Sequence, residues 1–104
     1  MKNISVNDLK QKIDEKDDFI FIDVREKGEL AIASIQDATH IPLMTLPSRL
    51  GELDKEKEIV IMCHSGVRSA QACLYLDTQG FDTYNVDGGI HAWSTEIDPN
   101  VEIY

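Results

Sequence analysis

The chain has 104 residues, of which 42% are hydrophobic, and its formal net charge is −9 at pH 7. A chain of this length can close one core and has little room for a second, so we expect a single domain over residues 1–104. The acidic balance opposes binding to nucleic acid or to an anionic membrane. No apolar run approaches the roughly 20 residues that span a bilayer, and the polar start lacks a signal region. These features predict a soluble, cytoplasmic protein, and we expect it to be a monomer.

The first half of the chain alternates helical patterns with short apolar runs. Ser5 is expected to cap a helix whose apolar face includes Val6, Leu9 and Ile13. The run Phe19–Ile22 predicts a buried strand. A short helix, a short strand and a further helix, interrupted at Gly51, are then expected over residues 29–35, 40–42 and 46–53.

The second half has stronger signals. The apolar run 59–62 predicts the central strand, and a helix is expected over residues 67–79, ended by a left-handed Gly80. A last strand over 83–86, a glycine turn and a short helix over 90–94 follow, and the segment after Pro99 is expected to lie on the body as a tail. Strands separated by helices imply an α/β fold with a parallel sheet covered on both faces. Its site lies beyond the carboxyl ends of the strands.

A cysteine stands at such a strand end. The stretch Cys63-His64-Ser65-Gly66-Val67-Arg68-Ser69 links the central strand to the strongest helix. The first backbone N–H groups of a helix have no intrahelical partners, and they favour a bound anion. Because helix N-termini and nearby cations lower the pKa of a thiol, we expect Cys63 to be an ionised nucleophile, with Arg68 adding positive charge.

Cys73 contrasts with Cys63, because it lies among apolar residues of a helix and is expected to pack in the core. The nine residues between the two cysteines match neither a redox pair nor the usual zinc spacings. His40 and His91 have no clustered ligands and are expected to be structural or exposed. We therefore expect no metal and no cofactor.

Several motifs in this order resemble the single-domain rhodaneses, the thiosulfate sulfurtransferases, over nearly the whole chain. The residues that carry the resemblance are Ile22-Asp23-Val24-Arg25-Glu26, Ile41-Pro42, the stretch from Cys63 to Ser69, and Gly88-Gly89-Ile90 with Trp93. The resemblance implies a rhodanese-like α/β fold, whose central parallel sheet has about five strands with helices on both faces. It also implies an enzyme of sulfur metabolism.

In this family the reaction is a double displacement through a persulfide. The resemblance implies that the Cys63 thiolate attacks the outer sulfur of a small donor such as thiosulfate, releasing sulfite. Backbone N–H groups of residues 64–69 would stabilise the charged terminal sulfur. A second nucleophile then removes that sulfur: cyanide in vitro, or a thiol or sulfur-carrier protein in the cell.

The remaining loop residues are assigned to substrate binding: His64, Ser65, Gly66, Val67, Arg68 and Ser69. Arg68 either holds an anionic donor at the rim or braces the loop, and the family favours bracing. His64 either tunes donor binding or is a solvated bystander. The two serines either donate hydrogen bonds to sulfur or cap the helix, which is the commoner role.

The pair Asp23 and Arg25 lies two residues apart at a strand end. It could belong to the site, but the family implies a structural ion pair. Gly88 and Gly89 need only turn geometry, and Trp93 is expected to pack.

Two departures from the family pattern concern local geometry and the donor. Residues 33–38 lack the histidine and both glycines of the usual Gly-His-Ile-Pro-Gly-Ala stretch, and His64 replaces a common arginine or lysine. The C-terminal segment 93–104 is similar to the ends of rhodanese domains fused to enzymes that activate ubiquitin-like proteins. That similarity favours a protein acceptor.

Two other functions stay open from the sequence. Rhodanese-like domains also serve as non-catalytic interaction or regulatory modules, although those usually lose the cysteine. Cysteine phosphatases place five residues between cysteine and arginine, whereas residues 64–67 make four here. The shorter loop disfavours a phosphatase and leaves arsenate reduction as a weaker alternative.

Overall fold

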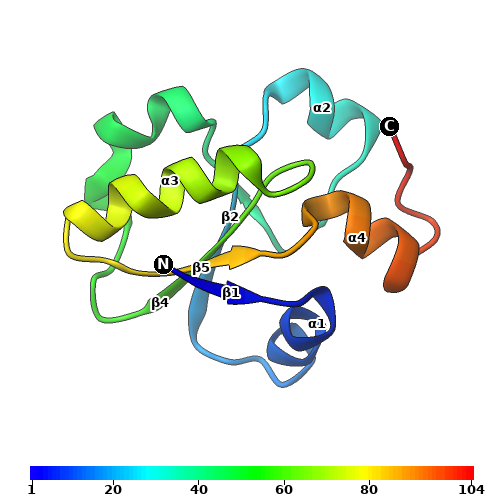
Figure 1. Cartoon of the computed structure of the whole chain (residues 1–104), viewed down its shortest axis with the longest axis horizontal. Helices are drawn as coiled ribbons and strands as arrows, with labels where there is room; N and C mark the ends of the chain where they lie inside the picture. The colour runs from blue at the N-terminus through cyan, green and yellow to red at the C-terminus, as the bar shows by residue number, and fades with distance from the viewer.

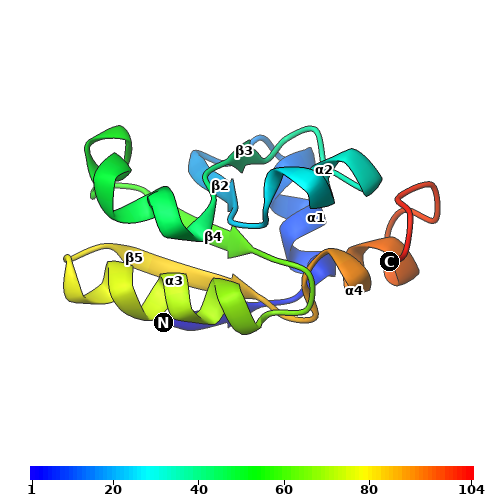
Figure 2. The ribbon, with the colours of Figure 1, turned by 90° about the horizontal axis from the view of Figure 1, so that it is seen from above.

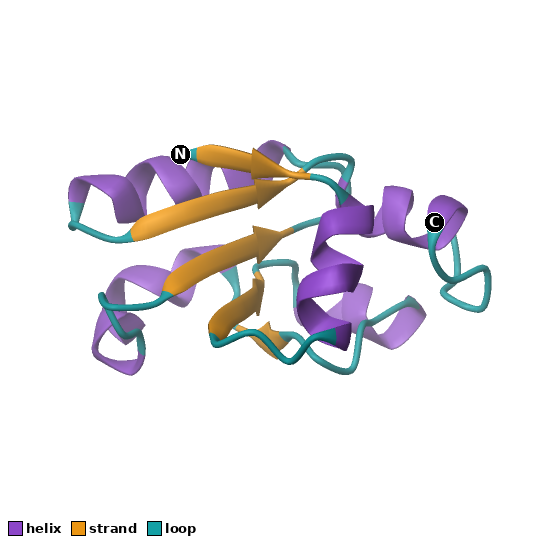
Figure 3. Ribbon diagram, turned by 90° about the horizontal axis from the view of Figure 1, so that it is seen from below, coloured by secondary structure: helices purple, strands orange, loops and turns teal.

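The computed structural model describes residues 1–104, and its centre is one parallel sheet of five strands (Figure 1). Neighbouring strands pair in parallel throughout the sheet, and Figure 3 draws them as orange arrows. The order across the sheet is β1-β5-β4-β2-β3. The strands are β1 (Lys2–Ile4), β2 (Phe19–Asp23), β3 (Thr39–His40), β4 (Glu58–Met62) and β5 (Asp82–Val86). The predicted α/β fold with about five parallel strands is confirmed.

Helices cover both faces of the sheet, as the views in Figures 1 and 2 show. They are α1 (Val6–Asp14), α2 (Lys27–Ile32), the 3-10 helix η1 (Leu43–Glu52), α3 (Val67–Thr78) and α4 (Gly89–Glu96). Side chains of β4 alternate between the faces, as they must in an extended strand. Ile59 and Ile61 pack with residues of α3 and η1, whereas Val60 and Met62 pack with residues of α1 and α4. Each face therefore has its own core.

Several local predictions are confirmed. Ser5 caps α1, because its Oγ accepts a hydrogen bond of 3.1 Å from the Asp8 backbone N–H. Gly80 follows α3 with a positive φ of 90°. Trp93 and Cys73 are buried in the two cores.

The structure adds one strand to the predicted elements and corrects three others. Strand β1 is not expected from the sequence, because only Ile4 of its three residues is apolar and buried. Helix α2 ends at Ile32 rather than at residue 35, and β3 excludes Pro42, which lacks the N–H of a ladder donor. The segment expected as a helix over 46–53 is a 3-10 helix that begins at Leu43 and contains Pro47.

The tail lies on the body, as predicted. The Ser94 hydroxyl donates to the Val101 carbonyl oxygen, and the Arg25 guanidinium donates to the Tyr104 hydroxyl at 2.9 Å. The C-terminus consequently reaches α2 (Figure 1). None of the helices combines the length and apolar character needed to cross a bilayer.

Candidate active site

Cys63 directly follows β4, and backbone hydrogen bonds join it and His64 to the start of α4. The carbonyl oxygens of Cys63 and His64 accept hydrogen bonds from the N–H groups of Ile90 and His91, at 2.9 and 3.1 Å. Gly89 permits this approach: a Cβ atom there would lie 2.5 Å from both carbonyl oxygens, and its φ is +58°. A glycine at this position is therefore required by the site as well as by the turn.

The Cys63 sulfur lies in a cup formed by the loop and the first turn of α3. The Gly66 N–H donates to Sγ at 3.1 Å, and Ser69 Oγ lies 3.2 Å from the same atom. Asn85 supports the cup from β5, because it accepts from Ser69 at 2.5 Å and donates to the Gly66 carbonyl at 3.1 Å. Gly66 has a φ of +118°, which turns the chain into α3.

The environment of Cys63 lowers the pKa of its thiol below the ordinary value. Burial is the largest influence and acts in the opposite direction, since Cys63 is only 1% exposed. The Ser69 hydroxyl and the backbone groups of Ser69, Gly66 and Ser65 together outweigh it. Hydrogen bonds to the charged form therefore favour the thiolate. The direction is the one expected from the sequence, but its chief cause is the hydrogen bonds and not the charge of Arg68.

None of the three surface pockets is lined by a residue of the stretch 63–69.

Arg68 is engaged by a carboxylate. Its guanidinium donates to both oxygens of Glu29, at 2.6 and 2.9 Å, in a bidentate pair between α3 and α2. The pair strongly lowers the pKa of Glu29 and raises that of Arg68, chiefly through these side-chain hydrogen bonds. Of the two roles open from the sequence, this geometry matches bracing of the loop.

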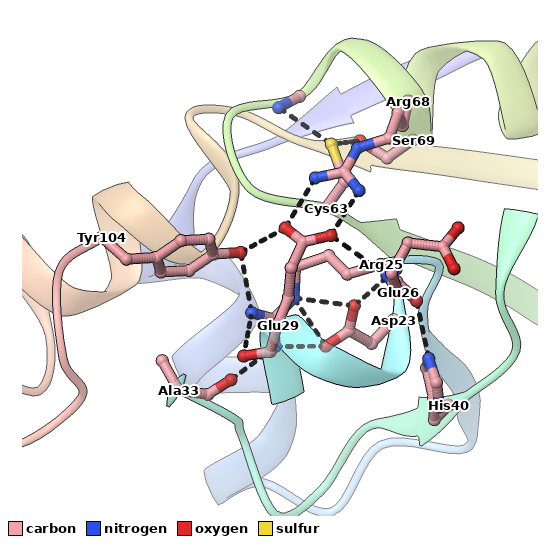
Figure 4. A network of polar contacts seen from close by, with 11 residues as sticks. Asp23, Arg25, Glu26, Glu29, Ala33, His40, Cys63, Arg68, Ser69 and Tyr104 are labelled. Carbon is pink, nitrogen blue, oxygen red and sulfur yellow. Dashed lines mark hydrogen bonds and ion pairs between the residues drawn. The ribbon is translucent and has the colours of Figure 1, made fainter. Parts of the chain in front are cut away.

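A second ion pair joins the first through Tyr104 (Figure 4). The Arg25 and Asp23 side chains pair at 2.8 Å with almost no exposure. Arg25 also donates to the Ala33 carbonyl at 2.7 Å. The Tyr104 hydroxyl accepts from Arg25 and donates to Glu29 Oε2 at 2.6 Å. One chain of contacts thus runs from β2 to the loop of Cys63.

The other predicted loop residues do not converge on the sulfur with their side chains. His64 stacks on the Tyr104 ring, with centroids 4.1 Å apart. Ser65 and Val67 are exposed, and α3 begins without a side-chain cap, so the expected capping by a serine is wrong. His40 contacts the Arg25 carbonyl oxygen at 2.6 Å, whereas His91 is exposed.

Three residues of the site were not identified from the sequence: Asn85, Glu29 and Tyr104. Asn85 could have been suspected, because a polar residue near the end of a strand often faces a site. Glu29 has a different local signal, the capping box that it forms with Glu26 at the start of α2. No local pattern marks Tyr104.

Comparison with known proteins finds relatives along nearly the whole chain. A putative sulfurtransferase of Bacillus subtilis, YtwF, is 46% identical over 99 residues, which cover 95% of this chain and 96% of that protein. A sulfurtransferase of Allochromatium vinosum is 38% identical, over 90% of this chain and 89% of its own.

A solved structure has the same fold. The crystal structure of a rhodanese-like domain protein from Staphylococcus aureus superimposes with a TM-score of 0.86 and 39% identity, over 100% of this chain and 99% of that one. The sequence pattern of the family described as "Rhodanese-like domain" matches residues 5–96. The chain belongs to the rhodanese-like domain family.

Proposed function

We propose that this protein is a sulfurtransferase that carries sulfur as a persulfide on Cys63, within one domain over residues 1–104. The observation that carries the proposal is the cup around Cys63 Sγ, where the Gly66 N–H and Ser69 Oγ lie 3.1 and 3.2 Å from the sulfur. Such preorganised donors stabilise a thiolate and, after loading, an anionic terminal sulfur. The sulfurtransferase names of the relatives support the same chemistry.

The reaction has two steps. The Cys63 thiolate attacks the outer sulfur of a donor such as thiosulfate, a sulfur–sulfur bond forms, and sulfite leaves with the electron pair of the broken bond. A thiophilic acceptor then attacks the terminal sulfur and restores the thiolate. Cyanide would serve in vitro, and a thiol or sulfur-carrier protein in the cell. The backbone N–H groups of the loop hold the charge throughout.

We assign the roles of the loop residues from their contacts. Gly66 and Ser69 hold the Cys63 sulfur that carries the transferred atom, and the backbone of Ser65 adds to the cup. His64 and Val67 form the rim. Arg68 braces the loop through Glu29, and the Asp23–Arg25 pair supports α2 and the tail structurally.

A single loading experiment tests the proposal. The protein is incubated with thiosulfate, desalted and weighed intact beside Cys63→Ser, and cyanide is then added to detect thiocyanate. We expect a gain of one sulfur atom that requires Cys63 and disappears with cyanide. Absence of the gain with thiosulfate and with a hydropersulfide, while Cys63 still reacts with iodoacetamide, would overturn the proposal and favour a non-catalytic module.

A further inference from the structure

The charge of Arg68, the cation that acts on Cys63, is compensated. Arg68 interacts electrostatically with the Cys63 thiolate, but its guanidinium is held by both oxygens of Glu29. Figure 4 shows the Arg68 guanidinium directed toward Glu29 beside the Cys63 sulfur. The positive potential of the cup therefore comes mainly from the dipoles of the loop and of α3.

Tyr104 fixes this arrangement from the other side. Its hydroxyl donates to Glu29 Oε2 at 2.6 Å, and its ring stacks on His64 at the rim. Glu29 has a side-chain exposure of 19% and accepts from Arg68, Tyr104 and the Glu26 N–H. A carboxylate with so many donors stays ionised and in place.

The network has no net positive charge. Asp23 and Glu29 contribute two carboxylates, and Arg25 and Arg68 contribute two guanidinium groups. The whole chain carries −9. A doubly charged anion that approaches the thiolate thus meets no uncompensated cation, and it meets a strongly negative molecule.

We propose that Glu29, held by Tyr104, is a specificity-determining residue that compensates Arg68 and so favours hydropersulfide donors, R–S–SH, over dianionic thiosulfate. This inference rests on the proposed function and deepens it. The S–SH group of a hydropersulfide donor brings at most one negative charge to the site, whereas the thiosulfate ion brings two. Like charges at a site reduce affinity and association rate.

The step with this donor is balanced. The Cys63 thiolate attacks the terminal sulfur of R–S–SH, the Cys63 S–S bond forms, and the donor S–S bond breaks. The leaving thiolate takes the proton of the donor and departs as R–SH. The product on the enzyme is the same anionic persulfide that thiosulfate gives, so no oxidant or reductant is needed.

The test measures sulfur loading of Cys63 with two donors, thiosulfate and the hydropersulfide of N-acetylcysteamine, whose R group is uncharged. Second-order loading rates are followed by intact mass at low ionic strength. In Glu29→Gln we expect the ratio of the thiosulfate rate to the hydropersulfide rate to rise about threefold to tenfold, because one negative charge near the thiolate is lost. Glu29→Asp, which keeps the carboxylate, should retain the wild-type ratio within about twofold.

The matched control is Glu52→Gln. Glu52 also accepts with both carboxylate oxygens from an arginine, Arg49, but the pair lies on the exposed side of η1. The substitution changes net charge equally, so it should shift the ratio by less than about twofold. A ratio in folded Glu29→Gln that equals that of the control would overturn the inference.

A measurement on the unmodified protein covers the case in which Glu29→Gln does not fold. Salt screens like-charge repulsion, so the thiosulfate rate should rise with ionic strength while the hydropersulfide rate changes little. Equal salt dependence for the two donors would overturn the inference. Loading by neither donor would instead overturn the proposed function, so the two failures are distinguishable.

Discussion

Ser69 Oγ lies 3.2 Å from Cys63 Sγ, and its hydroxyl has one proton for two acceptors. When the Ser69 hydroxyl donates to Asn85 Oδ1, the thiol can donate to Ser69 Oγ. When Cys63 is ionised, the hydroxyl stabilises it only by turning toward the sulfur. Asn85 therefore competes with the thiolate for the same donor.

Ser69→Ala should raise the pKa of Cys63 and slow its alkylation at pH 7, because Ser69 is the largest of the influences that lower that pKa. The variant should also lose about 1–2 kcal/mol of unfolding free energy, since Asn85 Oδ1 loses its donor. The pH profile of iodoacetamide alkylation measures the first effect. Ser48→Ala, on the exposed side of η1, is the control. An unchanged profile would contradict the role given to the hydroxyl.

Gly89→Ala should destabilise the protein by about 2–4 kcal/mol, through steric conflict and strain at a positive φ. The new Cβ would lie 2.5 Å from the carbonyl oxygens of Cys63 and His64. Urea unfolding measures the change. Gly28→Ala is the control, because nothing lies within 4 Å of its Cβ position and it stands in α2. That substitution should stabilise the protein by about 0.5–1 kcal/mol. Similar losses in both variants would contradict this account.

The sequence predicts the strands and the thiolate loop because their determinants are local. The continuous apolar run from Ile59 to Met62, followed by Cys63 and a helical pattern, needs no distant information. Strand β1 was missed for the opposite reason. It has a single buried residue, Ile4, and exists because residues 2–4 pair with β5, some 80 positions later.

The state of Arg68 also depends on a distant residue. The loop alone is compatible with an arginine that binds a donor or one that braces the loop. The choice is made by Glu29 on α2, which is 39 residues away, and by Tyr104 beyond it. The predicted bounds were wrong for η1, where Pro47 lacks the backbone N–H that an α-helix needs.

Arg25→Leu should cost about 3–5 kcal/mol of unfolding free energy, because it leaves the Asp23 carboxylate buried without its partner. The Ala33 carbonyl and the Tyr104 hydroxyl lose a donor as well. Thermal or urea unfolding measures the effect. Arg49→Leu, which removes a solvent-exposed pair with Glu52, should cost no more than about 1 kcal/mol. Equal costs at the two positions would contradict the importance of burial.

Stability should fall in acid partly because of Glu29. Its carboxyl pKa in the folded state lies far below the ordinary value of 4.5. A group with a lowered folded pKa contributes stability above its unfolded pKa and loses that contribution as pH falls toward the folded value. Glu29→Gln should therefore unfold with a shallower pH dependence below about pH 4.5. Urea midpoints between pH 3 and pH 7 would show this. Part of the pH dependence should remain in Glu29→Gln, because Lys12 also lowers the pKa of the Glu58 carboxyl. An unchanged slope would contradict the role of Glu29.

The two cysteines should differ sharply in reactivity although both are buried. Burial raises the pKa of Cys73 to about 11, while the cup lowers the pKa of Cys63. Because the thiolate is the reactive species, limited iodoacetamide at pH 7 should add one label per folded chain. Cys63→Ser should take up almost none, and Cys73→Ala should still take up one. In urea, the wild type should take up a second label, because unfolding exposes Cys73. Equal labelling of both cysteines in the folded chain would mean that the loop does not activate Cys63.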